Sequence, residues 1–205
     1  MEALSKLGGC VTCLVGVGCS ALPIVLTVYL GIYSFNNPDN DAWYGLNKNG
    51  KQSLYVDADA DTTAKELVDI HARFITWFLW GFIQMLAPFA AAILICIGYC
   101  LSPMLGQICG GLTGCGITCG GLAWWITGIV WRFRSDGSYS CGDIVQDGHT
   151  EEEWMVEVTK TGTLFQHKSG KFMAIYYLIC WSLIAFNMLC SIGAALYMCL
   201  CSKKE

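Results

Sequence analysis

Four long apolar blocks constrain what this chain can fold into. They cover about residues 7–33, 74–101, 104–131 and 172–200, and almost no charged residue lies inside them. Each block exceeds the roughly 20 residues that cross the hydrocarbon core of a bilayer as a helix. A buried helix of this length in a soluble protein shows a polar stripe, which these blocks lack. The sequence therefore predicts four transmembrane helices.

The composition and the spacing of the blocks predict the domain organisation. Charged residues make up 14% of the 205 residues, against about 25% in soluble proteins. We expect an all-α membrane protein, a single domain over residues 1–205 with four transmembrane helices packed as a bundle. The expected helices cover about 7–33, 63–101, 104–132 and 171–201. The two small extramembrane loops, 34–62 and 133–170, lie on one side of the membrane, and short β-hairpins can form in them.

Local signals refine the two loops. Asn49-Gly50, between aromatic and apolar segments, predicts a β-hairpin in the first loop. Thr63-x-x-Glu66 fits a capping box, which places the start of the second helix outside the membrane. In the second loop WMVEV, residues 154–158, alternates between apolar and polar, so we expect a strand that pairs with TLFQH.

Residues 107–125, QICGGLTGCGITCGGLAWW, are rich in glycine and cysteine. A phosphate-binding loop needs a preceding strand and a Lys after the last Gly, and this stretch has neither. Its glycines instead recur every four residues inside the third block, which is the spacing of a surface where another helix approaches closely. The predicted helix-packing residues are Gly106, Gly110, Gly114, Gly116 and Gly120.

The chain has 13 cysteines. Cys10 and Cys13 have the C-x-x-C spacing of a metal site, and Cys199 and Cys201 end at the same membrane face, but these cysteines sit in apolar helices without a neighbouring His. We therefore expect no metal and no cofactor. Cysteines beside a membrane are common sites of S-palmitoylation, so these four are candidates for lipidation if their face is cytosolic.

Two signals bear on the orientation. By raw count nine of the 12 Lys and Arg residues lie on the side of the two long loops, which favours cytosolic loops, whereas the cysteines favour cytosolic termini. With four spans, both termini and the short turn near Ser102 share one face, and the two long, acidic loops share the other. The cysteines gather at the terminal face, which favours a reducing, lipid-modifying cytosol there. We expect an integral multi-pass protein with cytosolic termini, and no organelle is predicted.

Few polar side chains lie inside the apolar blocks. Gln84 and Asn187 are the strongly polar ones, and either hydrogen bonds between helices or a pore lining accounts for them. In the loops, Cys141 and one of the histidines resemble a nucleophile pair. A single Cys with scattered histidines is more often incidental, and we expect a protein that is not an enzyme.

Three segments carry a resemblance to a known group. LPIVLTVYLGI in the first block, WRFRSDGSYSCGD after the third and SGKF before the fourth resemble the transmembrane protein 272-like group. Its members are small four-span membrane proteins without an assigned activity, so the resemblance implies that plan here. Claudins and tetraspanins share four spans, but this chain lacks their paired extracellular cysteines.

Taken together, these features predict a structural or assembly protein of a membrane, and an oligomeric channel or pore is the alternative. The expected partners are membrane lipids and further membrane chains, as a homo-oligomer or as a subunit of a larger assembly, and not nucleic acid. Tryptophans are more numerous than one small bundle needs at the membrane interface, so some are expected to contact neighbouring chains. These are Trp77, Trp80, Trp124, Trp125, Trp131 and Trp181.

Overall fold

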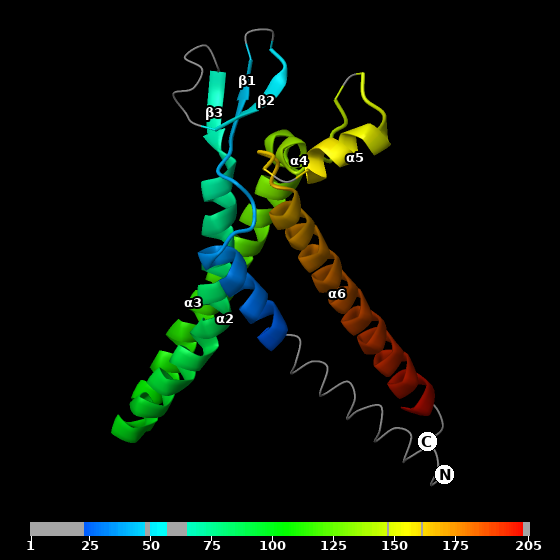
Figure 1. Ribbon diagram of the computed structural model, residues 1–205. Coiled ribbons are helices and arrows are strands. Elements are labelled where there is room, and N and C mark those ends of the chain that lie inside the picture. The colour runs from blue at the N-terminus through cyan, green and yellow to red at the C-terminus, as the bar shows by residue number, and fades with distance from the viewer. Residues whose placement is uncertain (1–22, 48–49, 57–64, 147, 161, 203–205) are drawn as a thin grey trace.

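A computed structural model describes residues 23–47, 50–56, 65–146, 148–160 and 162–202 (Figure 1). The described part is mostly helical, with a small antiparallel sheet. Within it, three helices are long and apolar enough to cross a membrane: α2 (Ile70–Leu101), α3 (Pro103–Phe133) and the His167–Phe186 part of α6 (His167–Ser202). A shorter apolar helix covers Pro23–Phe35. The rest of the first predicted span lies outside the described residues.

The helices α2 and α3 form a tight hairpin that turns at one residue. Ser102 ends α2, where its backbone N–H donates to the carbonyl of Gly98, and begins α3, where its hydroxyl accepts from the N–H of Leu105 at 3.1 Å. Pro103 then occupies the first turn, where its missing N–H costs nothing. A Cβ on Gly98 would stand 3.0 Å from the Cα of Gly106, so glycine lets the two backbones meet at the turn.

A three-stranded sheet stands at the other end of the α2–α3 hairpin. Its strands are β1 (Trp43–Leu46), β2 (Gln52–Tyr55) and β3 (Lys65–Asp69), in the order β2-β1-β3, all antiparallel. The hairpin predicted at Asn49-Gly50 is confirmed by the pairing of β1 with β2. Gly50 has φ of 72°, a conformation that glycine adopts without strain.

The predicted start of the second helix at residue 63 is wrong. Lys65–Asp69 pairs with β1 as a strand, so Glu66 does not lie in the first turn of a helix as the prediction required. Helix α2 begins at Ile70, and its N-cap is Asp69, whose Oδ1 accepts from the N–H of Ala72 at 2.7 Å. The edge of β1 satisfies the backbone groups of this segment, and tertiary pairing overrides the local helix signal.

The strand predicted over residues 154–158 is also wrong. The second loop contains two short helices, α4 (Ser135–Ser140) and α5 (Glu151–Thr159). Trp154 and Val158 are both buried and lie four residues apart, which is the period of one helix face. A capping box begins α5, since Thr150 and Glu153 exchange hydrogen bonds. We call the sheet, α4 and α5 together the cap.

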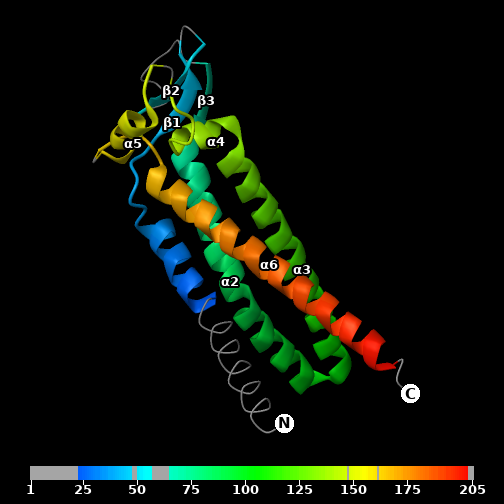
Figure 2. The same ribbon diagram turned by 90° about the vertical axis from the view of Figure 1, so that its right-hand side faces the viewer.

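Helix α6 packs against the α2–α3 hairpin only near the cap. Met173, Tyr176 and Tyr177 are buried, whereas Trp181 and Phe186 farther along α6 are more than half exposed. In Figure 1 α6 diverges from the α2–α3 pair with distance from the cap, and Figure 2 shows the α2–α3 turn and the end of α6 at the side opposite the cap. The three long helices therefore pack together most closely in the part of the molecule next to the cap.

The capping box generates a prediction for α5. Thr150→Ala removes the side-chain acceptor for the N–H of Glu153 and should destabilise α5 by about 1 kcal/mol. Hydrogen bonds from the backbone N–H and the hydroxyl of Thr150 lower the pKa of Glu153. The contribution of the ionised Glu153 is thus complete above the ordinary pKa of a glutamate and is lost as the pH falls through the lowered value.

Hydrogen exchange of the α5 amides measures both effects. The control is Thr159→Ala, because that hydroxyl only bonds to the carbonyl of Met155 within the same helix. Equal protection of α5 in Thr150→Ala and in the control would contradict the role of the capping box.

Candidate functional site

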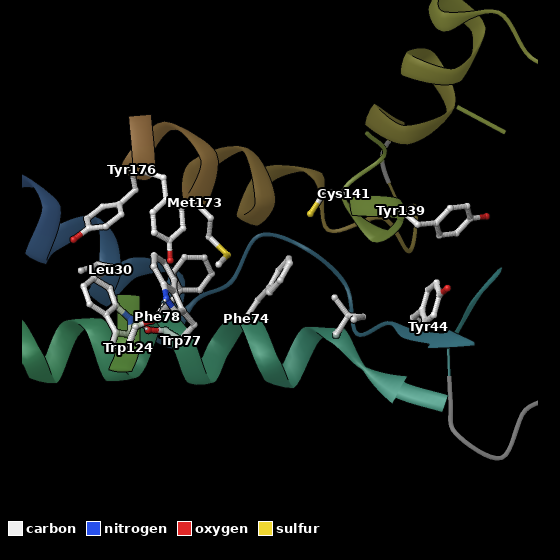
Figure 3. Packing of buried hydrophobic residues seen from close by; sticks show 12 residues of the cluster. Leu30, Tyr44, Phe74, Trp77, Phe78, Trp124, Tyr139, Cys141, Met173 and Tyr176 are labelled. Carbon is white, nitrogen blue, oxygen red and sulfur yellow. Dashed lines mark hydrogen bonds between the residues drawn. The ribbon is translucent and has the colours of Figure 1, made fainter. Parts of the chain in front are cut away.

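Two tryptophans join α2 to α3 by exchanging hydrogen bonds. The indole Nε1–H of Trp77 donates to the carbonyl of Trp124 at 3.1 Å, and the Nε1–H of Trp124 donates to the carbonyl of Trp77 at 2.8 Å. Their rings stack with centroids 4.9 Å apart and planes 22° apart. Both side chains are buried (Figure 3). Each buried indole thus satisfies its single donor on the helix that carries the other indole.

Helix α6 adds two tyrosines to this pair. The ring of Tyr176 lies 5.7 Å from that of Trp77 and 5.5 Å from that of Trp124, in edge-to-face geometry. The hydroxyl of Tyr177 donates to the carbonyl of Trp125 at 3.0 Å. We call Trp77, Trp124, Tyr176 and Tyr177 the aromatic junction. It is where the three long helices meet, and Figure 3 shows Tyr176 over the two indoles.

Two glycines make the aromatic junction possible. A Cβ on Gly81 of α2 would overlap the indole of Trp124. A Cβ on Gly128 of α3 would overlap both the indole nitrogen of Trp77 and the hydroxyl of Tyr177. Neither glycine belongs to the four-residue repeat predicted from the sequence. The sequence signal for them is their distance from a tryptophan. Gly81 lies four residues after Trp77 and Gly128 four residues after Trp124, about one helical turn in each case.

Two arginine–aspartate pairs fasten the cap to the helices. Arg132, at the end of α3 and only 4% exposed, donates through Nε to the carbonyl of Gly170 on α6 at 2.8 Å. Its guanidinium also binds both carboxylate oxygens of Asp143. Arg73 of α2 donates to Asp136 of α4 at 2.8 Å. The segment WRFRSDGSYSCGD, quoted above for its resemblance, thus supplies three of these four charged residues.

A cavity of about 450 Å³ opens beside Arg132, and its lining has mixed charge. The charged lining residues are Arg132, Asp143, Glu151 and Lys171, with His167 and Trp154 between them. Arg132 and Asp143 bind each other, so two of these charges are already satisfied within the lining. The cavity therefore presents no concentrated charge of either sign.

Cys141 is among the residues that line this cavity, and its burial disfavours a nucleophilic role for the thiol. Cys141 is 1% exposed, and burial raises its pKa to about 12, so the thiol stays protonated at neutral pH. The ring Nδ1 of His167 lies 3.2 Å from the carbonyl oxygen of Cys141, a backbone contact that does not activate the sulfur. Among the residues that the structure describes, no group of three or more His, Cys, Asp or Glu side chains has the geometry of a metal site.

The five glycines predicted to pack helices have different surroundings. A Cβ on Gly106 would overlap the ring of Tyr99, and one on Gly120 would stand 3.3 Å from Nε2 of Gln84, so both face α2. Gly110 has only ordinary contact with Ile95. For Gly114 and Gly116, no atom of the described chain lies within 4 Å of where a Cβ would stand.

Gln84 and Asn187 are the two side-chain amides predicted to lie inside the membrane. Gln84 of α2 donates through Nε2 to the carbonyl of Ile117 on α3 and lies against Gly120 and Gly121. Its amide therefore links two neighbouring helices. Asn187 belongs to α6, and its side chain lies outside what the structure describes.

The four lipidation candidates lie at the limits of the described chain. Cys10 and Cys13 are outside the described residues. Cys199 and Cys201 belong to the last turn of α6, which ends on the side opposite the cap, and their side chains are not described. Their acylation stays a prediction.

The tryptophans divide between the interior and the surface. Trp77 and Trp124 are buried within this chain, so they are not available to a neighbouring chain. Trp181 is 54% exposed on α6 and its ring lies 5.1 Å from that of Trp125. The expectation that some tryptophans contact other chains therefore no longer includes Trp77 and Trp124, and it stays a prediction for the other four.

The architecture suggests an integral multi-pass membrane protein, given three helices of sufficient length and apolarity. Comparison with known proteins adds no family to this class, because no protein-family model, curated protein or solved structure matches the chain. The resemblance to the transmembrane protein 272-like group stays a prediction that rests on the three segments quoted for it.

The aromatic junction predicts which glycines tolerate a methyl group. Gly128→Ala should destabilise the chain by about 1–3 kcal/mol, because the added methyl displaces Trp77 and Tyr177 from their hydrogen bonds. Gly114→Ala is the matched control on the same helix, where the methyl meets no described atom and the change in stability should be small. Thermal unfolding in detergent, followed by tryptophan fluorescence, measures both. Equal midpoints for the two variants would contradict the close packing at Gly128.

The buried thiol predicts a slow reaction with alkylating reagents. At pH 8 the thiol of Cys141 should react with iodoacetamide at least tenfold more slowly than an exposed cysteine, since both burial and the raised pKa limit the thiolate. The comparison is an exposed cysteine introduced into the cap by Thr159→Cys. Peptide mapping by mass spectrometry reads both sites in one sample. Similar rates in the native protein would show that Cys141 is accessible and reactive.

Proposed function

We propose that this chain is a non-enzymatic structural or assembly protein of a membrane, which packs through its transmembrane helices with copies of itself, with other membrane subunits or with lipid. The observation that carries the proposal is the open surface of α3 at Gly114 and Gly116. Glycine at these positions has no packing role within the described chain. Small residues at a helix surface in lipid favour close approach of another helix, because lipid contact gives larger apolar side chains little advantage.

One open flank of α3 lies below its contact with α6. Gly114 precedes Trp125 by eleven residues, about three helical turns, so the two share a helix face. At Trp125 this face is covered by Tyr177 and Trp181 of α6. Farther from the cap α6 diverges from α3 (Figure 1), and its apolar residues such as Ile184 and Phe186 are exposed. Within the described chain, the face that α6 covers near the cap is thus left open at Gly114.

The other open flank is an apolar groove between α2 and α3. It has a volume of about 450 Å³ and is lined by small or aliphatic residues, Gly116 among them. The groove residues include Ile83, Ala87, Ala90, Ala91, Gly116 and Ile117. An apolar lining of this kind favours a further helix or an acyl chain as its occupant, which supports packing on both sides of α3.

Two parts of the proposal concern the membrane environment. We place the termini in the cytosol, where Cys10, Cys13, Cys199 and Cys201 would be open to acylation.

The alternative function, a subunit of an oligomeric channel, has less support from the side chains. A pore lining needs polar groups free to meet water, and the amide of Gln84 is already bound to the backbone of α3.

The assembly of purified protein tests the proposal. We expect native mass spectrometry in a gentle detergent to detect particles with more than one protein chain. Gly114→Leu and Gly116→Leu should each reduce the assembled fraction by at least tenfold, because a leucine at either position blocks close helix approach. Their unfolding midpoints should stay near wild type, since the leucine meets no described neighbour at Cβ.

The matched control is Gly193→Leu on α6, where a Cβ likewise meets no described atom within 4 Å. This variant should assemble as wild type does. A wild-type protein that is a single chain under all gentle conditions, or assembly that survives leucine at both Gly114 and Gly116, would overturn the packing of α3 with further protein chains.

A further inference from the structure

His71 lies where three segments of the chain meet. It is the second residue of α2, and its side chain is 13% exposed. Its Nε2 lies 3.1 Å from a carboxylate oxygen of Asp41, in the segment that leads from the first helix into β1. Its Nδ1 lies 3.2 Å from Oε1 of Gln166, immediately before α6. One imidazole ring therefore connects the start of α2, the first loop and the start of α6.

The amide of Gln166 has only one possible orientation. Gln166 is 0% exposed, and its Nε2 donates to the backbone carbonyl of Asn40. A carbonyl oxygen only accepts, so the NH₂ group must point to Asn40. The oxygen Oε1 must then point to His71, where it also only accepts.

Both ring nitrogens of His71 consequently face acceptors. A neutral imidazole carries one N–H and satisfies one acceptor, whereas the imidazolium carries two. The observed arrangement is complete only with both protons in place. We propose that His71 is a proton-operated latch, which holds the first loop against the start of α6 when the ring is protonated and releases Asp41 when the ring is neutral.

The difference in burial between the two acceptors decides which contact is released. Gln166 is fully buried, so leaving its oxygen without a donor costs the desolvation of that group. Asp41 has a side chain that is 81% exposed, and water can replace the imidazole as its donor. The single proton of a neutral ring therefore stays on Nδ1, and the segment at Asp41 and Ala42 is freed.

The other charged groups around His71 have partners or lie in solvent. Asp39 accepts from the N–H of Ser169 at 2.7 Å, Asp69 caps α2, and Arg73 binds Asp136. Lys168 is exposed at the start of α6, and His167 contacts the carbonyl of Cys141. Asp41 is therefore the charged group whose contact changes when His71 gains or loses a proton.

Hydrogen exchange on the full chain in detergent tests the latch at about pH 5.5 and about pH 8, which bracket the range where imidazoles titrate. The amides of Ile70 and His71 donate to the carbonyl of Ala42 and report on the segment directly. After correction for the intrinsic pH dependence of exchange, we expect their protection to be about tenfold greater at acidic pH. This is the loss expected for one hydrogen bond to a charged group.

Three variants separate the latch from general effects of pH. His71→Gln removes the imidazole and should abolish the pH-dependent difference. Asp41→Asn should also abolish it, because an amide accepts from the imidazolium and donates to the neutral ring, and this exposed position leaves the fold intact. His149→Gln, at a histidine 3.5 Å from Glu157 elsewhere in the cap, should keep the full difference.

Equal protection of the wild-type amides at the two pH values would overturn the latch. So would an undiminished pH effect in Asp41→Asn, which decides the question even if His71→Gln fails to fold. Loss of the effect in His149→Gln would assign it to a different histidine and would also contradict the proposal.

Discussion

The reciprocal hydrogen bonds between Trp77 and Trp124 are the contact on which the arrangement of the long helices depends. In the membrane a helix satisfies its own backbone, so little besides close packing and side-chain hydrogen bonds holds two helices together. Here each indole donates to a carbonyl on the opposite helix, and the rings stack between those bonds. Gly81 and Gly128 give the rings their room, and α6 adds its tyrosines to the same place.

The packing of the helices differs on the two sides of the aromatic junction. Toward the cap, the buried core continues from the junction through Phe74 to Tyr139 and Tyr44 (Figure 3). The arginine–aspartate pairs lie beyond it and link α2 and α3 to the cap region. Away from the cap, α2 and α3 stay together while α6 diverges, and Gly114 and Gly116 of α3 have no close neighbour among the described residues. The part next to the cap is closely packed and keeps the fold of the chain. The part away from the cap has exposed helix faces, which suits the proposed binding of other membrane components. The proposed latch at His71 lies in the closely packed part, at the boundary between the cap and the helices.

The sequence predicts the features that depend on one segment alone. Apolar length identifies the described spans, and Asn49-Gly50 identifies the β1–β2 hairpin, because each signal acts within a few residues. The failures involve distant partners. Lys65–Asp69 becomes a strand because β1 lies beside it, and Trp154 and Val158 form a helix face because the cap core lies beneath them. The repeated glycines of α3 are a different case: Gly106 and Gly120 do contact α2 closely, but the glycine repeat does not include Gly81 and Gly128, whose importance depends on tryptophans of the other helix. His71 and Gln166, 95 residues apart, offered no local pattern at all.

A double-mutant cycle between Trp77 and Trp124 tests the central role of their contact most directly. Phenylalanine at either position keeps an aromatic ring but removes the indole donor, and unfolding in detergent gives the free energy for each single variant and for the double variant. If the two tryptophans act as one unit, the double variant loses less than the sum of the single losses, with an interaction energy of about 1 kcal/mol or more. Losses that add to within about 0.5 kcal/mol would show that the two side chains contribute independently, and the reciprocal contact would then not be what holds α2 to α3.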